Sequence, residues 1–144
     1  MKRIILCAFA LVACILGIQA QTQVIAHRGF WKTEGSAQNS ITALEKAAEA
    51  QLYGSEFDVL MTVDGKLVVN HDNKIEEMVI PETPYKKLKK LRIKNGEKLP
   101  TLKNYLKKGK KLDIQLILEA KPLPTKEMED QAIANIVKMV KKMG

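Results

Sequence analysis

Residues 56–72 read EFDVLMTVDGKLVVNHD, and they contain the strongest structural pattern of the 144-residue chain. Residues 56–61 alternate as in a β-strand, with Glu56 and Asp58 on one face and large apolar side chains on the other. The dipeptide Asp64-Gly65 is a strong hairpin signal, and the apolar run after it predicts a second strand over 66–71. The stretch therefore predicts a hairpin whose first strand has one apolar face and two carboxylates on the opposite face.

The flanking sequence alternates between strand and helix patterns. A helix is predicted over 40–52, with Asn39 or Ser40 as its N-cap and Gly54 as its stop. The other expected elements are a strand at 22–26, a helix that begins at Thr83-Pro84 and runs to 91, a helix from Thr101 that Gly109 ends, a strand over 112–120, and an amphipathic helix from beyond Pro124 almost to Gly144. This alternation is typical of the α/β class with a parallel sheet.

Length and composition limit what this fold can be. The chain is 46% apolar and 28% charged, which is the composition of one folded domain and excludes a disordered polyelectrolyte. A complete (β/α)8 barrel takes about 250 residues. The sequence is therefore too short for a whole barrel of that type.

The N-terminal segment has the pattern of a secretory signal peptide. Two basic residues precede an apolar run over 4–18, and small residues follow, so we expect residues 1–20 to be removed after Ala20. The alternative is a lipobox in which Cys14 is lipidated, and an uncleaved anchor is disfavoured because the run is short for a bilayer. Cleavage after Ala20 would remove Cys7 and Cys14, the only cysteines, and the product would be periplasmic or secreted.

Positive charge is concentrated in one stretch. The formal net charge is +8, and residues 86–111 carry twelve basic side chains opposed only by Glu97. Such a stretch attracts anionic lipid headgroups or nucleic acid when it forms one surface, or it is a pair of solvated helix faces. We expect the solvated faces, with no nucleic-acid partner and no membrane span after signal cleavage.

Polar clusters stand at the predicted strand ends. They are His27-Arg28, the pair Glu56 and Asp58, His71-Asp72, and Glu119 with Lys121. Because the carboxyl ends of parallel strands share one rim of a barrel, we expect these side chains to converge.

The residue types in these clusters indicate a particular chemistry. Carboxylates without a cysteine are hard oxygen donors that favour Ca²⁺ or Mg²⁺, although two acids can also stand on a solvated strand face. His27 and His71 suit proton transfer, since a free imidazole has a pKa of about 6.5. Arg28 and Lys121 would attract an anionic substrate, most simply a phosphate ester. Trp31 is either an apolar wall of the substrate pocket or an aromatic packed at the rim.

These motifs resemble those of the glycerophosphodiester phosphodiesterases. VIAHRG at 24–29 is similar to the opening strand and His-Arg-Gly motif of that family. EFDV at 56–59, Thr62 with Asp64-Gly65, and VVNHD at 68–72 match its long second block, and LEAK at 118–121 matches its Glu-x-Lys block. LPTL at 99–102 also resembles a segment that precedes a family helix.

The resemblance implies a TIM-barrel hydrolase that cleaves glycerophosphodiesters to glycerol 3-phosphate and an alcohol. It implies that His27 and His71 are the acid and base, in an order left open, and that the substrate's own glycerol hydroxyl attacks to give a cyclic phosphate. It assigns Glu56, Asp58 and Glu119 to a divalent metal, Ca²⁺ or Mg²⁺. Arg28 and Lys121 would contact the phosphate.

Two departures from the family pattern are visible. The family's Pro-Glu-Asn-Thr is replaced by AQNS at 37–40, so an acid is replaced by Gln38, which can still hydrogen-bond. The matched blocks belong to the N-terminal half of the family domain, about four of eight strands. We therefore expect residues 21–144 to form about half of a barrel with open sheet edges, either as a fragment or as a half that self-associates.

Two other functions fit the same residues. One is a phospholipase-type phosphodiesterase on the same barrel. The other is a non-enzymatic module that binds anionic surfaces through the lysine-rich stretch.

Overall fold

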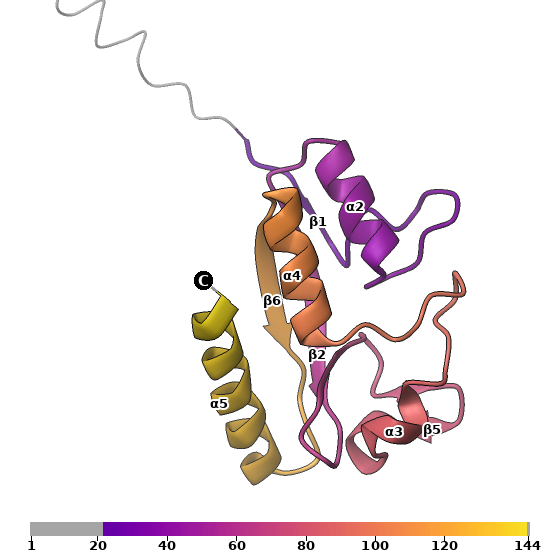
Figure 1. Ribbon diagram of the computed structural model, residues 1–144, viewed down its shortest axis with the longest axis vertical. Coiled ribbons are helices and arrows are strands. Elements are labelled where there is room, and N and C mark those ends of the chain that lie inside the picture. The colour runs from indigo at the N-terminus through magenta and orange to yellow at the C-terminus, as the bar shows by residue number, and fades with distance from the viewer. Residues whose placement is uncertain (1–21, 144) are drawn as a thin grey trace, which may run out of the picture.

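A four-stranded mixed sheet lies at the centre of the computed structural model, which describes residues 22–143 (Figure 1). Its longest strand, β2 (Gly54–Met61), pairs in parallel with β1 (Ile25–Ala26) and with β6 (Gln115–Ala120), and antiparallel with β3 (Leu67–Val69). β6 occupies one edge of β2, while β1 and β3 share the other edge at opposite ends of the strand. The α/β class is confirmed, and three strands of this sheet are parallel.

Three helices cover one face of this sheet. They are α2 (Ile41–Glu49), α4 (Leu102–Leu112) and α5 (Lys126–Met143). The apolar face of β2 packs beneath them in one buried cluster, in which Phe57 stacks on Tyr105 of α4 with ring centroids 4.4 Å apart. The predicted alternation of β2 is therefore confirmed, and it leaves Glu56 and Asp58 on the face away from the helices.

A second, smaller apolar cluster lies under the connection between β3 and α4. Leu60 and Val68 meet there with buried residues of this connection. The connection contains the two-stranded sheet of β4 (Lys74–Ile75) and β5 (Met78–Val79), the 3₁₀ turn Ile80–Glu82 and the short helix α3 (Tyr85–Leu88). The sequence patterns predicted only a longer helix in this region.

Two glycine predictions are wrong for the same reason. Gly54 opens β2 instead of ending α2, and the left-handed residue after α2 is Gln51 (φ 53°). Gly109 lies inside α4, which ends at the left-handed Asp113 (φ 53°). A Cβ at Gly109 would lie 2.5 Å from Leu116 Cδ1, so glycine is needed there for close packing of α4 on β6. Both glycines serve tertiary contacts that local sequence does not reveal.

The helix starts follow their capping chemistry. Ser40 and Thr101 are the N-caps of α2 and α4, and each side chain accepts a backbone N–H of the first turn, as expected. For α3 the expected cap is wrong by one residue, because Pro84 occupies the cap position. The Tyr85 N–H is instead bound at 3.0 Å by the Asp64 carboxylate of the hairpin turn, which ties this helix to β2 and β3.

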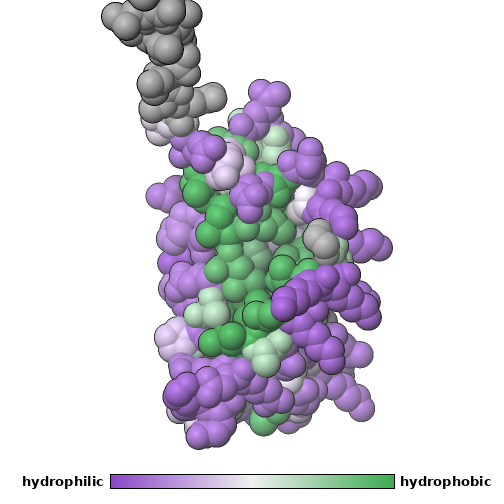
Figure 2. Space-filling model, turned by 90° about the vertical axis from the view of Figure 1, so that its left-hand side faces the viewer, coloured by the Kyte–Doolittle hydropathy of each residue, from purple (hydrophilic) through white to green (hydrophobic). Residues whose placement is uncertain are grey.

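One side of the molecule is apolar. Within the described residues β6 has β2 as its only strand partner, and the side chains of Ile133, Val137 and Val140 on α5 are 51%, 45% and 44% exposed. Figure 2 views the side on which α5 and β6 lie and shows a band of apolar surface between polar margins. We call the free edge of β6 together with these three residues the apolar flank.

The N-terminal predictions lie outside the described part of the chain. The signal peptide at 1–20, its cleavage after Ala20 and the lipobox alternative at Cys14 all fall there. Between residues 22 and 143, none of the helices has the length and apolar character required to cross a bilayer.

Candidate active site

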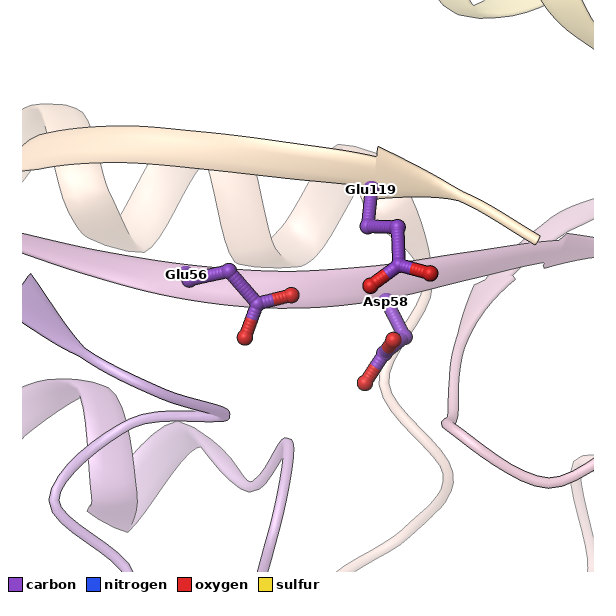
Figure 3. A group of neighbouring side chains, drawn as sticks. All are labelled: Glu56, Asp58 and Glu119. Atoms are coloured by element: carbon purple, nitrogen blue, oxygen red, sulfur yellow. The ribbon is translucent and has the colours of Figure 1, made fainter.

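Three carboxylates meet at the face of the sheet opposite the helices. Glu56 and Asp58 alternate on β2, and Glu119 is the β6 residue in register with Asp58. One oxygen from each side chain lies within 4.8 Å of the others (Figure 3). Neighbouring parallel strands thus bring two residues from the second sequence block and one from the third into a single cluster, as the shared rim predicts.

Asp58 is fully buried and is held by the loop between β1 and α2. The Asn39 amide donates to Asp58 Oδ2 at 2.8 Å, and the Asp58 backbone N–H donates to Asn39 Oδ1 at 3.1 Å. Asn39 has a left-handed backbone (φ 61°), as does Arg28 (φ 59°), and a hydrogen bond of 2.9 Å runs from the Asn39 N–H to the Arg28 carbonyl. Such backbone conformations are uncommon for residues other than glycine and concentrate at functional sites.

The glycine after Arg28 allows this loop to approach α2. Gly29 is left-handed (φ 77°), and a Cβ on it would lie 2.6 Å from Ala43 Cβ. The turn keeps the Arg28 N–H directed at Glu56, whose Oε2 accepts at 2.8 Å. The His-Arg-Gly motif thus fixes two of the carboxylates, one through the Arg28 backbone and one through Asn39.

The cluster fits a hard divalent cation. Glu56 Oε1 and Asp58 Oδ1 are buried and have no hydrogen-bond partner. Burial raises the pKa of Glu56, and the neighbouring Asp58 raises it further, while the Arg28 hydrogen bond opposes both. Two buried carboxylate oxygens that accept no hydrogen bond, beside a third acid, supply the oxygen donors that Ca²⁺ and Mg²⁺ prefer.

Two cations lie against these acids. Arg28 Nε is 3.6 Å from Asp58 Oδ2, and Arg28 Nη1 donates to Gln38 Oε1 at 2.8 Å. Lys121 Nζ lies 2.9 Å from Glu119 Oε1 and 3.5 Å from Asp58 Oδ1. The hydrogen bond from Lys121 lowers the pKa of Glu119, and the same bond raises the pKa of Lys121. We call these five residues (Arg28, Glu56, Asp58, Glu119 and Lys121) the polar rim.

The histidines differ in how they are held. His27 Nε2 lies 3.8 Å from Glu56 Oε2, and 67% of its side chain is exposed. His71 is more buried, and its Nδ1 lies 2.8 Å from Asp72 Oδ1. His71 makes no hydrogen bond to the polar rim, yet it is near enough to Glu119 to help lower the pKa of that carboxyl. The structure thus brings His27 into the cluster and places His71 beside it.

Three residues have supporting roles that their sequence patterns did not predict. Asn39 was a candidate N-cap and is instead the clamp on Asp58. The Asp72 carboxylate orients His71, and Glu97, which stood alone in the lysine-rich stretch, accepts the first N–H groups of α2 from Ile41 and Thr42 at 2.9 and 3.1 Å. Only Asn39 had a usable signal, its place directly before a helix and after a glycine-containing loop.

The chain is similar to known proteins. The model of the glycerophosphoryl diester phosphodiesterase family matches residues 27–144. A curated glycerophosphodiester phosphodiesterase of Caldanaerobacter subterraneus is 38% identical over 94 residues, which are 57% of this chain and 38% of that protein.

Solved structures match over a longer part of the chain. A glycerophosphodiester phosphodiesterase from Parabacteroides distasonis has a TM-score of 0.82 and 56% identity, covering 84% of this chain and 51% of that one. An Oleispira antarctica phosphodiesterase, solved with the product sn-glycerol-3-phosphate, has a TM-score of 0.75 and 28% identity, covering 85% and 53%. The chain thus corresponds to about half of each solved relative, and to a smaller share of the curated one.

Proposed function

Since the chain belongs to the glycerophosphoryl diester phosphodiesterase family, we propose that it takes part in metal-dependent hydrolysis of glycerophosphodiesters to glycerol 3-phosphate and an alcohol. The observation that carries the proposal is the meeting of Glu56, Asp58 and Glu119 with Arg28 and Lys121 on one face of two neighbouring strands. The product named in the Oleispira structure, sn-glycerol-3-phosphate, has the chemistry that such a site would bind.

The three carboxylates would hold Ca²⁺ or Mg²⁺, which supplies charge neutralisation at the phosphoryl oxygens when bound. Arg28 and Lys121 add positive charge on the same side of the sheet, and both are already fixed by the acids that they contact. Positive groups fixed before the reaction stabilise developing negative charge without rearranging. The substrate phosphate would therefore lie against the polar rim.

His71 is suited to move a proton because Asp72 orients its ring. An Nδ1–H donated to Asp72 leaves Nε2 free to accept a proton from the attacking hydroxyl. We propose that this hydroxyl belongs to the glycerol part of the substrate, which gives a cyclic phosphate. His27, exposed at the edge of the cluster, would then protonate the leaving alkoxide. A water molecule would next attack the cyclic phosphate and give a proton to His27. The bond from phosphorus to the oxygen that closed the ring would break, and His71 would return its proton to that oxygen, which yields glycerol 3-phosphate.

The remaining proposals concern the place and assembly of the protein. We propose that residues 1–20 direct export to the periplasm or the medium. We also propose that the apolar flank is covered by self-association, since an exposed strand edge beside an apolar helix face favours pairing with another chain.

A coupled assay for glycerol 3-phosphate tests the activity. The full chain is incubated with a panel of glycerophosphodiesters with Mg²⁺ or Ca²⁺, and with a chelator. Product that forms with the metal and stops with the chelator is the expected result, with Asp58→Asn as the inactive control. Release that the chelator leaves unchanged, or release by Asp58→Asn at the wild-type rate, would contradict the proposed site.

A further inference from the structure

A cavity of about 620 Å³ opens beside the polar rim. Its lining comes from the loop between β1 and α2, from the segment over 70–76, and from Arg92–Lys94. Gln38 and Asn39 lie in its wall while bonding to Arg28 and Asp58, and His71 lines it as well. The cavity therefore adjoins the polar rim through the side chains of Gln38 and Asn39.

The cavity is large enough for a sizeable substituent. Small-molecule sites typically measure about 300–1,000 Å³. Its apolar lining includes the half-buried Trp31 and Ile93 and the buried Ile75. The sequence allowed two roles for Trp31, a pocket wall or an aromatic packed at the rim, and in the structure Trp31 lines this cavity. Lys32 Nζ lies 5.4 Å from the centroid of its ring.

The charged lining holds four basic and three acidic side chains. Lys32, Lys74, Arg92 and Lys94 line the cavity, and none of these four makes an ion pair within the described chain. The acids of the lining are Glu34, Asp72 and Glu76, of which Asp72 is bound to His71. Residues 86–98, which lead into the Arg92–Lys94 wall, contain seven basic side chains and one acid, Glu97. The potential at this mouth therefore favours an anion.

The cationic wall is fixed in place by polar contacts. The Glu97 carboxylate binds the Ile41 and Thr42 N–H groups at the start of α2, and those bonds, with one from Asn95, hold its pKa below the usual value against the effect of burial. The Asn95 amide donates to the Gly35 carbonyl at 3.2 Å. The one acid of residues 86–98 is thus used to anchor the wall and does not neutralise Arg92 or Lys94.

We propose that this cavity receives the alcohol part of the diester, and that this alcohol carries its own anionic group, as a phosphorylated sugar alcohol does. The inference rests on the proposed function for the position of the scissile phosphate. Quaternary ammonium groups are recognised by open aromatic faces, whereas here the single aromatic side chain of the lining has Lys32 over its ring. A choline headgroup is therefore disfavoured.

Calorimetry tests the inference: each probe is titrated into the full chain in the presence of Ca²⁺. Phosphorus NMR checks that each probe stays intact during the titration. The probes are glycerophosphoinositol phosphate, glycerophosphoinositol and glycerophosphocholine, with glycerol 3-phosphate as the reference for the phosphate site alone. The affinity is expected to fall in the order anionic, neutral and cationic headgroup, by about tenfold or more across the series.

Two matched double variants distinguish binding of the anionic group in the cavity from its general attraction to a positively charged protein. Arg92→Gln with Lys94→Gln should weaken the anionic diester about fivefold or more and leave glycerol 3-phosphate unchanged. Lys87→Gln with Lys90→Gln removes the same charge from exposed positions outside the lining and should leave the preference intact.

Each outcome decides between the two proposals. Equal affinities for the three diesters, or tightest binding of the choline compound, would overturn the inference about the cavity. If glycerol 3-phosphate still bound in that case, the proposed phosphate site on the polar rim would stand. An anionic diester that binds through Arg92 and Lys94 when glycerol 3-phosphate does not bind would uphold the cavity and count against the proposed function. Absence of binding by every probe would overturn both.

Discussion

The polar rim and the apolar flank share strand β6, yet they differ in how their exposed groups are paired. On the rim every charged group has a partner of opposite charge or a hydrogen bond from β1, β2, β6 or their loops. On the flank the free edge of β6 and the side chains of α5 face solvent. The site thus depends on contacts inside the described chain, whereas the scaffold exposes an apolar surface for which we propose a partner. Two properties should therefore respond separately to mutation: metal binding to the rim and self-association to the flank.

The largest effect is expected from Asp58→Asn. This change removes one carboxylate from the cluster and the counter-charge of Arg28 and Lys121. Loss of a residue that merely supports a metal ligand costs about 10–100-fold in affinity, so loss of the ligand should cost at least about 100-fold. Calorimetric titration with Mg²⁺ or Ca²⁺ measures it, and an affinity equal to wild type would remove Asp58 from the metal site.

Asn39→Ala should have the next largest effect on the rim. Without the amide clamp Asp58 keeps its charge and loses its orientation, so metal affinity should fall about 10–100-fold. Asn104→Ala, at an exposed position of α4, is the control and should bind metal as wild type does. Equal affinities in the two variants would show that the clamp has no role in positioning Asp58.

The flank is tested by Ile133→Lys combined with Val137→Lys. Both side chains are exposed on α5, so the substitutions should leave the core intact and reduce self-association measured by analytical ultracentrifugation. Metal affinity should not change. A variant that associates as strongly as wild type would move the interface elsewhere, and one that also loses metal would show that rim and flank are coupled.

Gly109→Ala should affect stability with little effect on either property. The added methyl group meets Leu116 at 2.5 Å, and overpacking of this kind costs about 1–3 kcal/mol of unfolding free energy. Lys107→Ala, at an exposed position of the same helix, is the matched control. Chemical denaturation measures the difference, and equal midpoints for the two variants would mean that α4 can shift away from β6 at no cost.

The smallest effect is a pH dependence from Glu97. The pKa of Glu97 is lowered in the folded chain because hydrogen bonds from α2 and Asn95 outweigh the effect of burial. The contribution of Glu97 to the free energy of unfolding is therefore present above its unfolded pKa of about 4.5, and it is lost as the pH falls through the folded pKa. Glu97→Gln should remove about 1 kcal/mol at pH 7 and less at pH 3, as measured by denaturation. An equal loss at both pH values would show that its charge is not involved.

Features that depend on neighbouring residues could be predicted from sequence. The alternation of β2 assigned Phe57 to the core and Asp58 to the opposite face, and the Asp64-Gly65 turn and the caps Ser40 and Thr101 are local hydrogen-bonding patterns. The convergence of the carboxylates also followed, because parallel strands share a rim.

Features that depend on distant partners could not be predicted. Gly109 looks like a helix stop until Leu116 is placed against it, and Asn39 looks like a cap until Asp58, 19 residues away, is seen to bind it. Glu97 reaches α2 across 55 residues of chain, and its place among lysines gives no sign of that contact. In each case a tertiary contact decided between two locally reasonable roles.

Calorimetric titration of glycerol 3-phosphate into the full chain tests the central claim most directly, namely that the polar rim of this chain is a metal-dependent phosphate-ester site. We expect glycerol 3-phosphate to bind saturably, one molecule per site, in the presence of Ca²⁺ or Mg²⁺. This binding should be lost when a chelator is added and in the Asp58→Asn variant. Binding of equal strength with and without the metal, or no binding under either condition, would contradict it.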